Sequence, residues 1–381
     1  MAEAKKVKHV LLLTTSYKSC FNNQSSPFFR DQAIALKKAG LKVGVLCPLP
    51  ISLKQIWKTK KIKFSREIYL DQGVETMVYP FLSLPKMRGL ARKKRLLIGK
   101  SIFKKYVEEH GLPNIIHLHT FLAGELAIWV KEQFQVPYVV TEHSSAFQRE
   151  LLNRSQLELA QEVFSKSKTN IAVSKSLANF LSKRYSIPFL VIPNIVDVAF
   201  FHPNKSEKSL YTFINVAHLN KNKNQAMLIR AFEKHHQVFP NSRLLILGGG
   251  EEKANLQALV SRLGLAESVL LFGDATREEV RAAMQNSDCF VLPSKVETFG
   301  VVLIEAMACG IPVVSTRSGG PESIIVNSDL GILCENNSEA ISKAMAFVSK
   351  QQYSSAQIRS YVVENFSEDV AIKKIIELYN F

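Results

Sequence analysis

The 381-residue sequence lacks the features of a membrane-spanning, secreted or fibrous protein. No stretch of roughly 18 uncharged apolar residues is present, which excludes a membrane-crossing helix. The apolar run at residues 10–13 is too short for a secretory signal, and we expect it to form the first β-strand. The five cysteines form no Cys-x-x-Cys pair and are odd in number, which favours a reduced, cytosolic compartment. With 46% hydrophobic and 22% charged residues, the composition excludes a disordered tail, a collagen-like chain and a coiled coil.

Acidic side chains are scarce in the first third of the chain. Residues 1–110 hold 23 Lys and Arg against 7 Asp and Glu, whereas the remaining residues hold 26 of each. The whole net charge of +16 therefore lies in residues 1–110, and residues 51–105 alone carry 15 basic and 3 acidic side chains. A protein that covers nucleic acid would spread its positive charge along the chain. This local excess of basic residues therefore indicates a local anionic partner.

Short apolar runs alternate with segments of helical period along the chain, which indicates parallel sheets covered on both faces by helices. We expect strands at 7–13, 42–47, 75–79, 114–118, 138–141, 169–173, 189–192, 211–217, 243–247, 269–272, 289–292, 312–315 and 331–334. We expect helices at 27–39, 92–109, 124–134, 175–184, 225–239, 253–263, 277–284, 301–309 and 339–349.

These elements predict an α/β protein with two doubly wound domains. The N-terminal domain is expected over residues 1–190 and the second domain over residues 191–353. Two further helices in residues 354–381 are expected to pack back on the N-terminal domain. Open parallel sheets bind ligands at the carboxyl ends of their strands, which predicts a ligand cleft between the two domains.

The strongest chemical signal is the segment PSKVETFGVVLIEAMACGIPVVSTRSGGPE at residues 293–322. Glu297 falls in a turn, and a helix is expected to begin near Gly300. Gly300 lets a ligand approach the backbone, and the free amides of a helix start face an anion. Carboxylates beside an anion-binding site are explained if they bind hydroxyl groups. Glu305 would then bind the hydroxyls of a ribose, and Glu297 would bind those of a sugar. For either glutamate alone, a capping or an ordinary exposed side chain is the structural alternative.

This segment resembles the signature of the retaining GT-B-fold glycosyltransferases of family 4. The matching residues are Glu297, Phe299, Gly300, Glu305, Ala306, Gly310, Pro312 and Val313. The resemblance implies a GT-B fold, in which two Rossmann-like domains face a central cleft. It also implies that Glu305 binds the nucleotide ribose and that Glu297 contacts the transferred sugar. The donor diphosphate would lie on the amides of Phe299, Gly300, Val301 and Val302.

Two further segments resemble the same family. In VAHLNKNKNQAMLIRAF, at residues 216–232, Lys223 takes the position of a lysine that binds the diphosphate. The family's arginine position is His218 here, and a neutral imidazole holds a leaving phosphate less firmly than a guanidinium does. In the turn that ends the strand at 269–272, Leu271 and Phe272 are expected beside the nucleotide base.

In the N-terminal half, His119 ends an expected strand, and the family has an active-site histidine at this position beside the donor sugar. A neutral imidazole there can accept a hydrogen bond from a sugar hydroxyl. His117 is interpreted as a buried structural residue, because no further ligand accompanies the two histidines to form a metal site. Glu142 and His143 end the next strand and face the same cleft, with a cap of the following segment as the alternative for Glu142.

The first loop departs from the family pattern. Many relatives have two glycines there, near the diphosphate, whereas this chain has Ser25 and Ser26 at about that place. Their hydroxyls and amides can still meet a phosphate. Arg30 is a further candidate for contact with the phosphate.

The predicted function is that of a glycosyltransferase of the hexosyl or N-acetylhexosaminyl type, which retains the anomeric configuration of the sugar. Its predicted catalytic residues are His119, Lys223 and Glu297. The expected donor is a UDP-sugar first and a GDP-sugar second. The expected acceptor is a glycan or a lipid-linked sugar in cell-surface polysaccharide or glycolipid synthesis. The chain has no Asp-x-Asp, which argues against metal-held diphosphate, so we expect neither metal nor cofactor.

The basic segment predicts where the enzyme acts. Residues 86–105 fit an interfacial helix on anionic lipid, with Leu90, Leu97, Ile98, Ile102 and Phe103 as its apolar positions. Residues 54–66 alternate Ile56, Trp57, Ile62 and Phe64 with lysines. We therefore expect a peripheral enzyme at the cytoplasmic face of the membrane, with no nucleic-acid partner. For the basic segment, the alternative is a helix packed on the sheet with a solvated basic face. For the whole protein, the alternatives are a nucleic-acid-binding protein, another GT-B enzyme and a catalytically silent GT-B scaffold.

Overall fold

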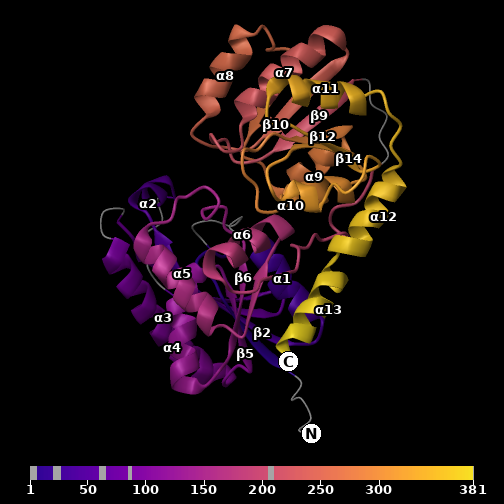
Figure 1. Cartoon of the computed structure of the whole chain (residues 1–381). Helices are drawn as coiled ribbons and strands as arrows, with labels where there is room; N and C mark the ends of the chain where they lie inside the picture. The colour runs from indigo at the N-terminus through magenta and orange to yellow at the C-terminus, as the bar shows by residue number, and fades with distance from the viewer. Residues whose placement is uncertain (1–6, 20–26, 60–65, 85–87, 205–209, 381) are drawn as a thin grey trace. The chain divides into compact units, whose positions relative to one another are not determined.

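The computed structural model describes residues 7–19, 27–59, 66–84, 88–204 and 210–380, which fall into two compact units (Figure 1). Unit 1 comprises Met1–Val173, Ala178–Ile192 and Glu368–Phe381, and unit 2 comprises Ser174–Leu177 and Pro193–Ser367. The main division after Ile192 lies two residues beyond the expected domain limit at residue 190.

Unit 1 is built on an eight-stranded sheet in the order β3-β4-β2-β1-β5-β6-β7-β8, and every pair but β3–β4 is parallel. Its strands are β1 (His9–Leu13), β2 (Lys42–Ile51), β3 (Glu67–Asp71), β4 (Val74–Leu82), β5 (Ile115–His119), β6 (Tyr138–Glu142), β7 (Thr169–Ala172) and β8 (Leu190–Val191). Strands β1, β5 and β6 are buried at every position, because helices cover both faces of the sheet.

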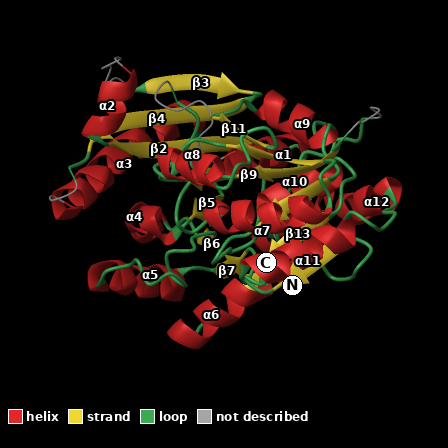
Figure 2. Cartoon of the chain, turned by 90° about the horizontal axis from the view of Figure 1, so that it is seen from above, coloured by secondary structure: helices red, strands yellow, loops and turns green. Residues whose placement is uncertain are grey.

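Helices alternate with most of these strands along the chain. Figure 2 shows helices in red and strands in yellow. They are α1 (Pro27–Lys38), α2 (Leu53–Thr59), α3 (Arg88–His110), η2 (Phe121–Ala123), α4 (Gly124–Phe134), α5 (Arg154–Lys166), α6 (Lys175–Tyr185) and, much later in the chain, α13 (Glu368–Tyr379). The strand–helix alternation is the pattern that the sequence predicts for a doubly wound sheet.

Unit 2 has a six-stranded parallel sheet in the order β11-β10-β9-β12-β13-β14. Its strands are β9 (Tyr211–Val216), β10 (Ser242–Leu247), β11 (Val269–Gly273), β12 (Cys289–Leu292), β13 (Val313–Thr316) and β14 (Gly331–Cys334). Its helices are α7 (Gln225–Val238), α8 (Lys253–Arg262), α9 (Arg277–Gln285), α10 (Val301–Ala308), η3 (Pro321–Ser323), α11 (Ser338–Val348) and α12 (Ser355–Phe366).

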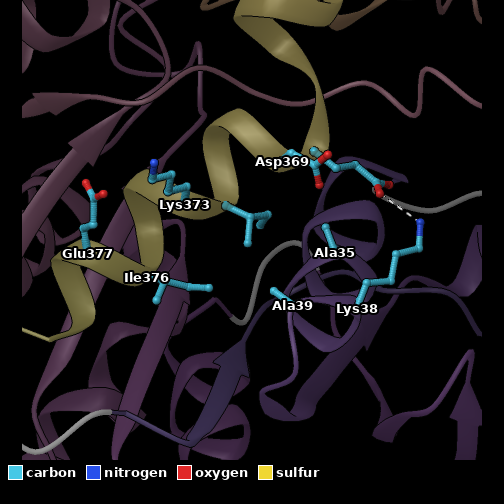
Figure 3. Close-up of a pocket in the computed structure, with 9 residues that line it drawn as sticks. Ala35, Lys38, Ala39, Asp369, Lys373, Ile376 and Glu377 are labelled. Atoms are coloured by element: carbon cyan, nitrogen blue, oxygen red, sulfur yellow. Dashed lines mark hydrogen bonds and ion pairs between the residues drawn. The ribbon is translucent and has the colours of Figure 1, made fainter.

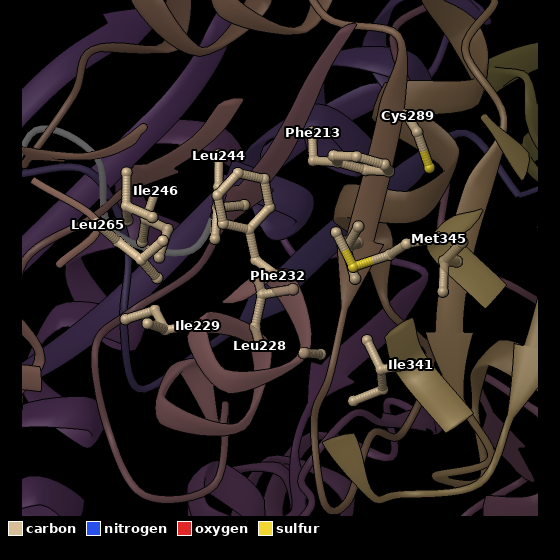
Figure 4. Close-up of a cluster of buried hydrophobic side chains, with 14 of the residues drawn as sticks. Phe213, Leu228, Ile229, Phe232, Leu244, Ile246, Leu265, Cys289, Ile341 and Met345 are labelled. Carbon is tan, nitrogen blue, oxygen red and sulfur yellow. The ribbon is translucent and has the colours of Figure 1, made fainter. Parts of the chain in front are cut away.

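The core of unit 2 joins the sheet to the helices that cover it. Phe213 of β9, Phe232 of α7 and Met345 of α11 are fully buried and belong to one apolar cluster (Figure 4). Leu244 and Ile246 of β10 alternate into the same cluster. This burial of apolar surface is the main favourable term that holds the layers together.

Strand β3, helices α2 and α5 and the short helix η2 of unit 1 were not expected. Strand β3 pairs antiparallel with β4 through the turn at Gln72 and Gly73, both of which have positive φ, as a two-residue hairpin requires. Helix α5 begins with a capping box, in which Asn153 and Gln156 bond each other's backbone.

The two helices in residues 354–381 do not stay together, which corrects the prediction that both pack on the N-terminal domain. Helix α12 belongs to unit 2, where Arg359 donates to the carbonyl oxygens of Val198, Phe201 and Ala308. Helix α13 belongs to unit 1, where its first residue, Glu368, forms a 2.8 Å ion pair with Lys38 of α1. The chain changes units at Ser367.

Candidate functional site

Glu297 lies in the loop between β12 and α10, and the loop after β13 fixes its backbone. Its N–H donates to the Ser318 carbonyl oxygen at 2.9 Å, and its own carbonyl oxygen accepts from the Gly320 N–H at 2.8 Å. A Cβ atom at Gly320 would lie only 2.3 Å from the backbone nitrogen of Phe299. The two loops therefore touch backbone to backbone, which requires glycine at position 320.

Lys223 contacts Glu297 directly. The Lys223 ammonium donates to Oε1 of Glu297, and the Ser294 hydroxyl donates to the same oxygen at 2.7 Å. The Asn222 side chain donates to the Val296 carbonyl oxygen at 2.9 Å, which joins the two loops. The fold thus brings together two predicted catalytic residues that are 74 positions apart, and their charges balance in this structure.

The predicted phosphate-binding amides lie on the same loop, at the start of α10. Gly300 precedes the helix with a φ of 96°, a left-handed conformation that residues with a side chain rarely adopt. Val301 and Val302 form the first turn, whose N–H groups have no acceptors within a helix. The Phe299 ring is buried, and Glu305 is half-buried one turn further along.

His218 follows β9 and is 64% exposed. Its Nδ1 lies 4.0 Å from a carboxylate oxygen of Glu251, a residue that no motif in the sequence pointed to. The loop that carries His218 packs closely on the glycine run after β10, where a Cβ atom at Gly248 would lie 2.0 Å from the Ala217 carbonyl oxygen. These glycines therefore shape the loop that presents His218.

Leu271 and Phe272 lie at the end of β11, as expected. Leu271 is half-buried and packs against the core of unit 2, whereas Phe272 is 48% exposed. Gly273 follows with a φ of 95° and its carbonyl oxygen accepts from the Gly248 N–H, so the turns after β10 and β11 are joined.

In unit 1, His119 ends β5 and is fully buried. Its Nδ1 lies 3.2 Å from Nε2 of His143, and its ring packs on Phe29 at 4.7 Å between centroids. Its Nε2 has no hydrogen-bond partner among the residues that the structure describes. Burial, with His117 and His143 nearby, holds the pKa of His119 well below its usual value, so the ring is neutral.

Glu142 ends β6, and its carboxylate caps backbone groups. It accepts from the N–H groups of Phe121 at 3.1 Å, His143 at 3.0 Å and Ser144 at 2.8 Å. Burial raises the pKa of Glu142 to about 7, although these three hydrogen bonds act in the opposite direction. The capping alternative therefore describes Glu142, which holds the loops that follow His119 and His143.

Arg30 lies in α1 and is committed to an ion pair with Asp71. Its guanidinium donates to both carboxylate oxygens, at 2.6 and 2.7 Å, and Asp71 is buried. We therefore leave Arg30 out of the site proposed below. Ser25 and Ser26 lie outside the described residues.

His117 is fully buried, as expected, and stacks on His119 with ring centroids 4.6 Å apart. Its ring nitrogens contact the hydroxyls of Tyr379 and Thr141. Across the described ranges, no group of three or more His, Cys, Asp or Glu side chains is arranged to hold a metal ion.

The basic segment forms the expected helix, α3, but only some of its apolar positions are exposed. Leu90 and Leu97 are 57% and 68% exposed, whereas Ile102 and Phe103 are buried within unit 1, contrary to their predicted place on an interface. Ile98 is half-buried, Ile56 is buried in α2, and Trp57 beside it is 83% exposed. Ile62 and Phe64 lie outside the described residues. Within the described part of the chain, no helix combines the length and apolar character that spanning a bilayer requires.

Comparison with known structures defines the fold. The fold is similar to that of sucrose-phosphate synthase from Thermosynechococcus elongatus, with a TM-score of 0.80 and 18% identity over 98% of both chains. It is also similar to Anabaena HepE in complex with UDP, with a TM-score of 0.74 and 17% identity over 97% of this chain and 98% of HepE. The two parallel-sheet units and these neighbours identify a GT-B fold, as the sequence predicts.

Comparison of sequences gives the family. The model for "Glycosyl transferases group 1" matches residues 198–365, and the model for "Glycosyltransferase Family 4" matches residues 28–200. The chain belongs to the GT-B glycosyltransferases of family 4. It is 23% identical over 362 residues to TuaC of Bacillus subtilis, a glycosyltransferase named for teichuronic acid biosynthesis, with 90% of each chain covered.

Proposed function

We propose that this glycosyltransferase moves a sugar from a nucleoside-diphosphate sugar to a glycan or lipid-linked acceptor with retention of configuration. The observation that carries the proposal is the Lys223–Glu297 pair beside the amides that begin α10. UDP is favoured as the nucleotide, because the similar HepE structure contains UDP, and GDP is the second candidate. Polysaccharide or glycolipid synthesis fits the name of the relative TuaC.

Unit 2 supplies the groups for the donor. A diphosphate bound at the start of α10 takes the place of the Glu297 carboxylate as the partner of Lys223. The ammonium and the helix amides then stabilise the negative charge that grows as the bond between sugar C1 and phosphate oxygen breaks. Glu297, released from Lys223, accepts hydrogen bonds from the sugar, and Glu305 accepts them from the ribose hydroxyls.

Unit 1 supplies His119, whose unpaired Nε2 hydrogen-bonds a hydroxyl of the transferred sugar. The acceptor oxygen bonds to C1 on the face that the diphosphate leaves, and the acceptor proton passes to the leaving phosphate oxygen. This step needs no enzymic base. With positive charge supplied by Lys223 and the helix amides, we propose that it also needs no divalent metal.

Replacing Lys223 tests the role of the donor site. We expect Lys223→Gln to lower kcat by about 100-fold, because a charge that stabilises the transition state is lost. Lys221→Gln is the matched control, since Lys221 is an exposed lysine of the same loop. If both variants transferred sugar equally well, Lys223 would not hold the diphosphate.

The product and the donor are identified by separate measurements. NMR of the product should show the anomeric configuration of the donor, and an inverted product would refute the same-face mechanism. Thermal unfolding with UDP-, GDP- and ADP-sugars should show a raised Tm with a UDP-sugar, because a donor that binds only the folded chain stabilises it. A shift with GDP-sugars alone would replace UDP by GDP in the proposal.

We also propose that the outer face of α3 binds anionic lipid at the cytoplasmic side of a membrane. Leu90, Lys93, Leu97 and Lys104 follow one another at helical spacing and are all exposed. Exposed leucines among lysines suit the boundary between lipid headgroups and acyl chains. Trp57 of α2 adds an exposed aromatic ring to the same unit.

Vesicle binding tests this surface. Lys93→Gln with Lys104→Gln should weaken binding to phosphatidylglycerol vesicles about 30-fold, because each lysine near an anionic surface contributes about 1 kcal/mol. Leu90→Gln with Leu97→Gln should also weaken it. Leu151→Gln with Leu270→Gln is the control, since these leucines are 58% and 59% exposed elsewhere on the chain. Unchanged binding in the α3 variants would rule out the surface.

A further inference from the structure

Tyr379, near the end of α13, reaches the strand that carries His119. Its hydroxyl lies 2.6 Å from Nδ1 of His117, a residue 262 positions earlier in the chain. On the other side of the ring, Nε2 of His117 lies 2.7 Å from the Thr141 hydroxyl. Tyr379 and Thr141 are themselves buried, so both ends of the His117 imidazole are held within the protein.

The hydrogen-bond partners assign the proton on His117. Burial raises the pKa of Tyr379 well above its usual value, so its hydroxyl keeps its proton and can donate. The side-chain amide nitrogen of Gln32, also a donor, lies 3.3 Å from the same Nδ1. Because two donors point at Nδ1, this nitrogen is the acceptor, and the ring proton lies on Nε2 and is donated to Thr141. Burial lowers the pKa of His117 to about 3, so the ring is neutral.

His117 in turn supports His119. The two residues alternate on β5, so their side chains point to the same face of the sheet. Their rings are nearly parallel, with an interplanar angle of 14° and centroids 4.6 Å apart. Phe29 and His143 contact other parts of the His119 ring. The orientation of the unpaired Nε2 of His119 therefore depends on where the His117 ring lies.

Helix α13 has its own attachments to unit 1, which keep Tyr379 in place. Lys38 of α1 and Glu368 form the ion pair that Figure 3 shows as a dashed line, and Ala35 and Ile376 line the groove between the two helices. Further along α13, Ile372 and Ile375 are buried. Tyr379 thus sits on a helix that is fixed at its start and along its buried face.

We propose that Tyr379 and His117 are positioning residues for His119. Tyr379 holds His117 in one tautomer and one ring plane, and the stacked His117 ring sets the direction in which Nε2 of His119 meets the sugar. This inference rests on the proposed function, in which His119 contacts the transferred sugar. It assigns to α13 a part in sugar transfer, although α13 lies outside both segments matched by the family models.

The test replaces Tyr379 by Phe, which keeps the ring and removes only the hydroxyl. Imidazole ¹⁵N NMR should show His117 leaving its single Nε2–H tautomer, and the ¹⁵N signals of His119 should shift. We expect kcat to fall about tenfold while KM for the donor changes less than twofold, because a small misplacement near the reacting centre mainly affects the chemical step. Thr141→Val removes the partner of the other nitrogen and should act in the same direction.

Tyr106→Phe is the matched control. Tyr106 is another buried tyrosine of unit 1, and its hydroxyl lies 2.7 Å from Nε2 of His9. This variant loses the same kind of hydrogen bond, so it should lose similar stability, while kcat and the His119 signals should stay as in the wild type. If Tyr379→Phe matched Tyr106→Phe in kcat or left the His119 signals unchanged, the positioning role would be overturned.

His119→Ala separates this inference from the proposed function. If His119→Ala transferred sugar at the wild-type rate, the contact between His119 and the sugar would fail, and the positioning role would fail with it. If His119→Ala lost transfer while Tyr379→Phe behaved like its control, the proposed function would stand and only the role of Tyr379 would fall.

Discussion

At the scale of single residues, His235 of α7 is a polar side chain in an apolar environment. Its ring stacks on Phe239 with centroids 4.9 Å apart and meets the edge of Phe213 at 4.9 Å. Neither ring nitrogen has a hydrogen-bond partner among the described residues. Burial lowers the pKa of His235 to about 4, so the folded chain keeps this ring neutral.

We expect His235→Leu to stabilise unit 2. Removing an unsatisfied buried polar group should raise the free energy of unfolding by about 1–3 kcal/mol at pH 7. The gain should be larger at pH 5. Below about pH 6.5 the unfolded wild-type chain protonates His235, which lowers the free energy of unfolding of the wild type, whereas the leucine variant has no group to protonate there. Urea titrations at both pH values measure the effect.

His236→Leu is the control for this prediction. His236 is half-buried next to His235, and its Nδ1 lies 3.2 Å from the Ser242 hydroxyl, so its loss should bring no gain. If both variants had the same free energy of unfolding, the cost assigned to the unpaired His235 would be wrong.

Residue by residue, the sequence predicted contacts that a local motif marks and missed those that only the fold creates. Lys223 and Glu297 each belong to a short segment with a family pattern, and the structure places them in contact. Tyr379 lies in an ordinary helical segment, and its partner His117 is 262 positions away, so nothing local marks the pair. Arg30 carried a charge suited to phosphate, but its partner Asp71 is 41 positions later, in a strand that was not expected.

At the scale of elements, the loop after β13 limits how the loop before α10 can lie. The backbone of Gly320 has a φ of −75°, which any residue can adopt, so only space requires glycine there. A Cβ atom would lie 2.3 Å from the nitrogen and 2.4 Å from the Cα atom of Phe299. Neither backbone atom can move without shifting the loop that leads into α10, where the proposed donor site begins.

We expect Gly320→Ala to weaken binding of UDP at least tenfold, because the extra methyl group pushes the loop of Glu297 away from its place beside Lys223. The free energy of unfolding should fall by about 1–3 kcal/mol, the usual cost of forcing an extra methyl group into a packed site. Calorimetry with UDP and urea titration measure the two effects.

Gly89→Ala serves as the comparison for this change. Gly89 lies in α3 with no atom within 4 Å of an added Cβ, so this variant should bind UDP normally and be at least as stable. Normal UDP binding by Gly320→Ala would show that the loop adjusts without effect on the site.

Elements with a continuous apolar run could be predicted from sequence, and those with mixed patterns could not. Strands β1, β5 and β6 are buried at every position and stand out for that reason. Strand β3, at the edge of the sheet, alternates half-buried and exposed positions before the buried Asp71. Because it begins with Glu67 and ends with Asp71, it has no continuous apolar run. Helix α12 resembles α13 in pattern, so the sequence could not show that the two belong to different units.

At the scale of the whole molecule, buried titratable groups set the response to pH. Burial is the main cause that lowers the pKa of His9 and His235 to about 4, that of His117 to about 3 and that of His119 well below its usual value. The unfolded chain therefore binds more protons than the folded chain below about pH 6.5. Glu142 acts in the opposite direction, because its pKa is raised to about 7 and the folded chain holds that proton between about pH 4.5 and 7.

The effect of the four histidines on the free energy of unfolding is larger than the opposite effect of Glu142. We therefore expect the chain to lose stability in mild acid. Between pH 6.5 and 5 the free energies of unfolding of the two units together should fall by about 5 kcal/mol. Urea titrations at pH 6.5 and 5 measure the loss, and proton uptake on unfolding gives an independent check. Equal stability at the two pH values would contradict the neutral, buried state of these histidines.

The way in which the units share the chain has a consequence for the order of folding during synthesis. Unit 1 needs residues 368–381, and all of unit 2 lies before them in the chain. During translation, the sheet of unit 2 is therefore complete before the ribosome has made α13. His117 has no Tyr379 to bond until then, so the surroundings of His119 are completed only after the strands of unit 2 have been made.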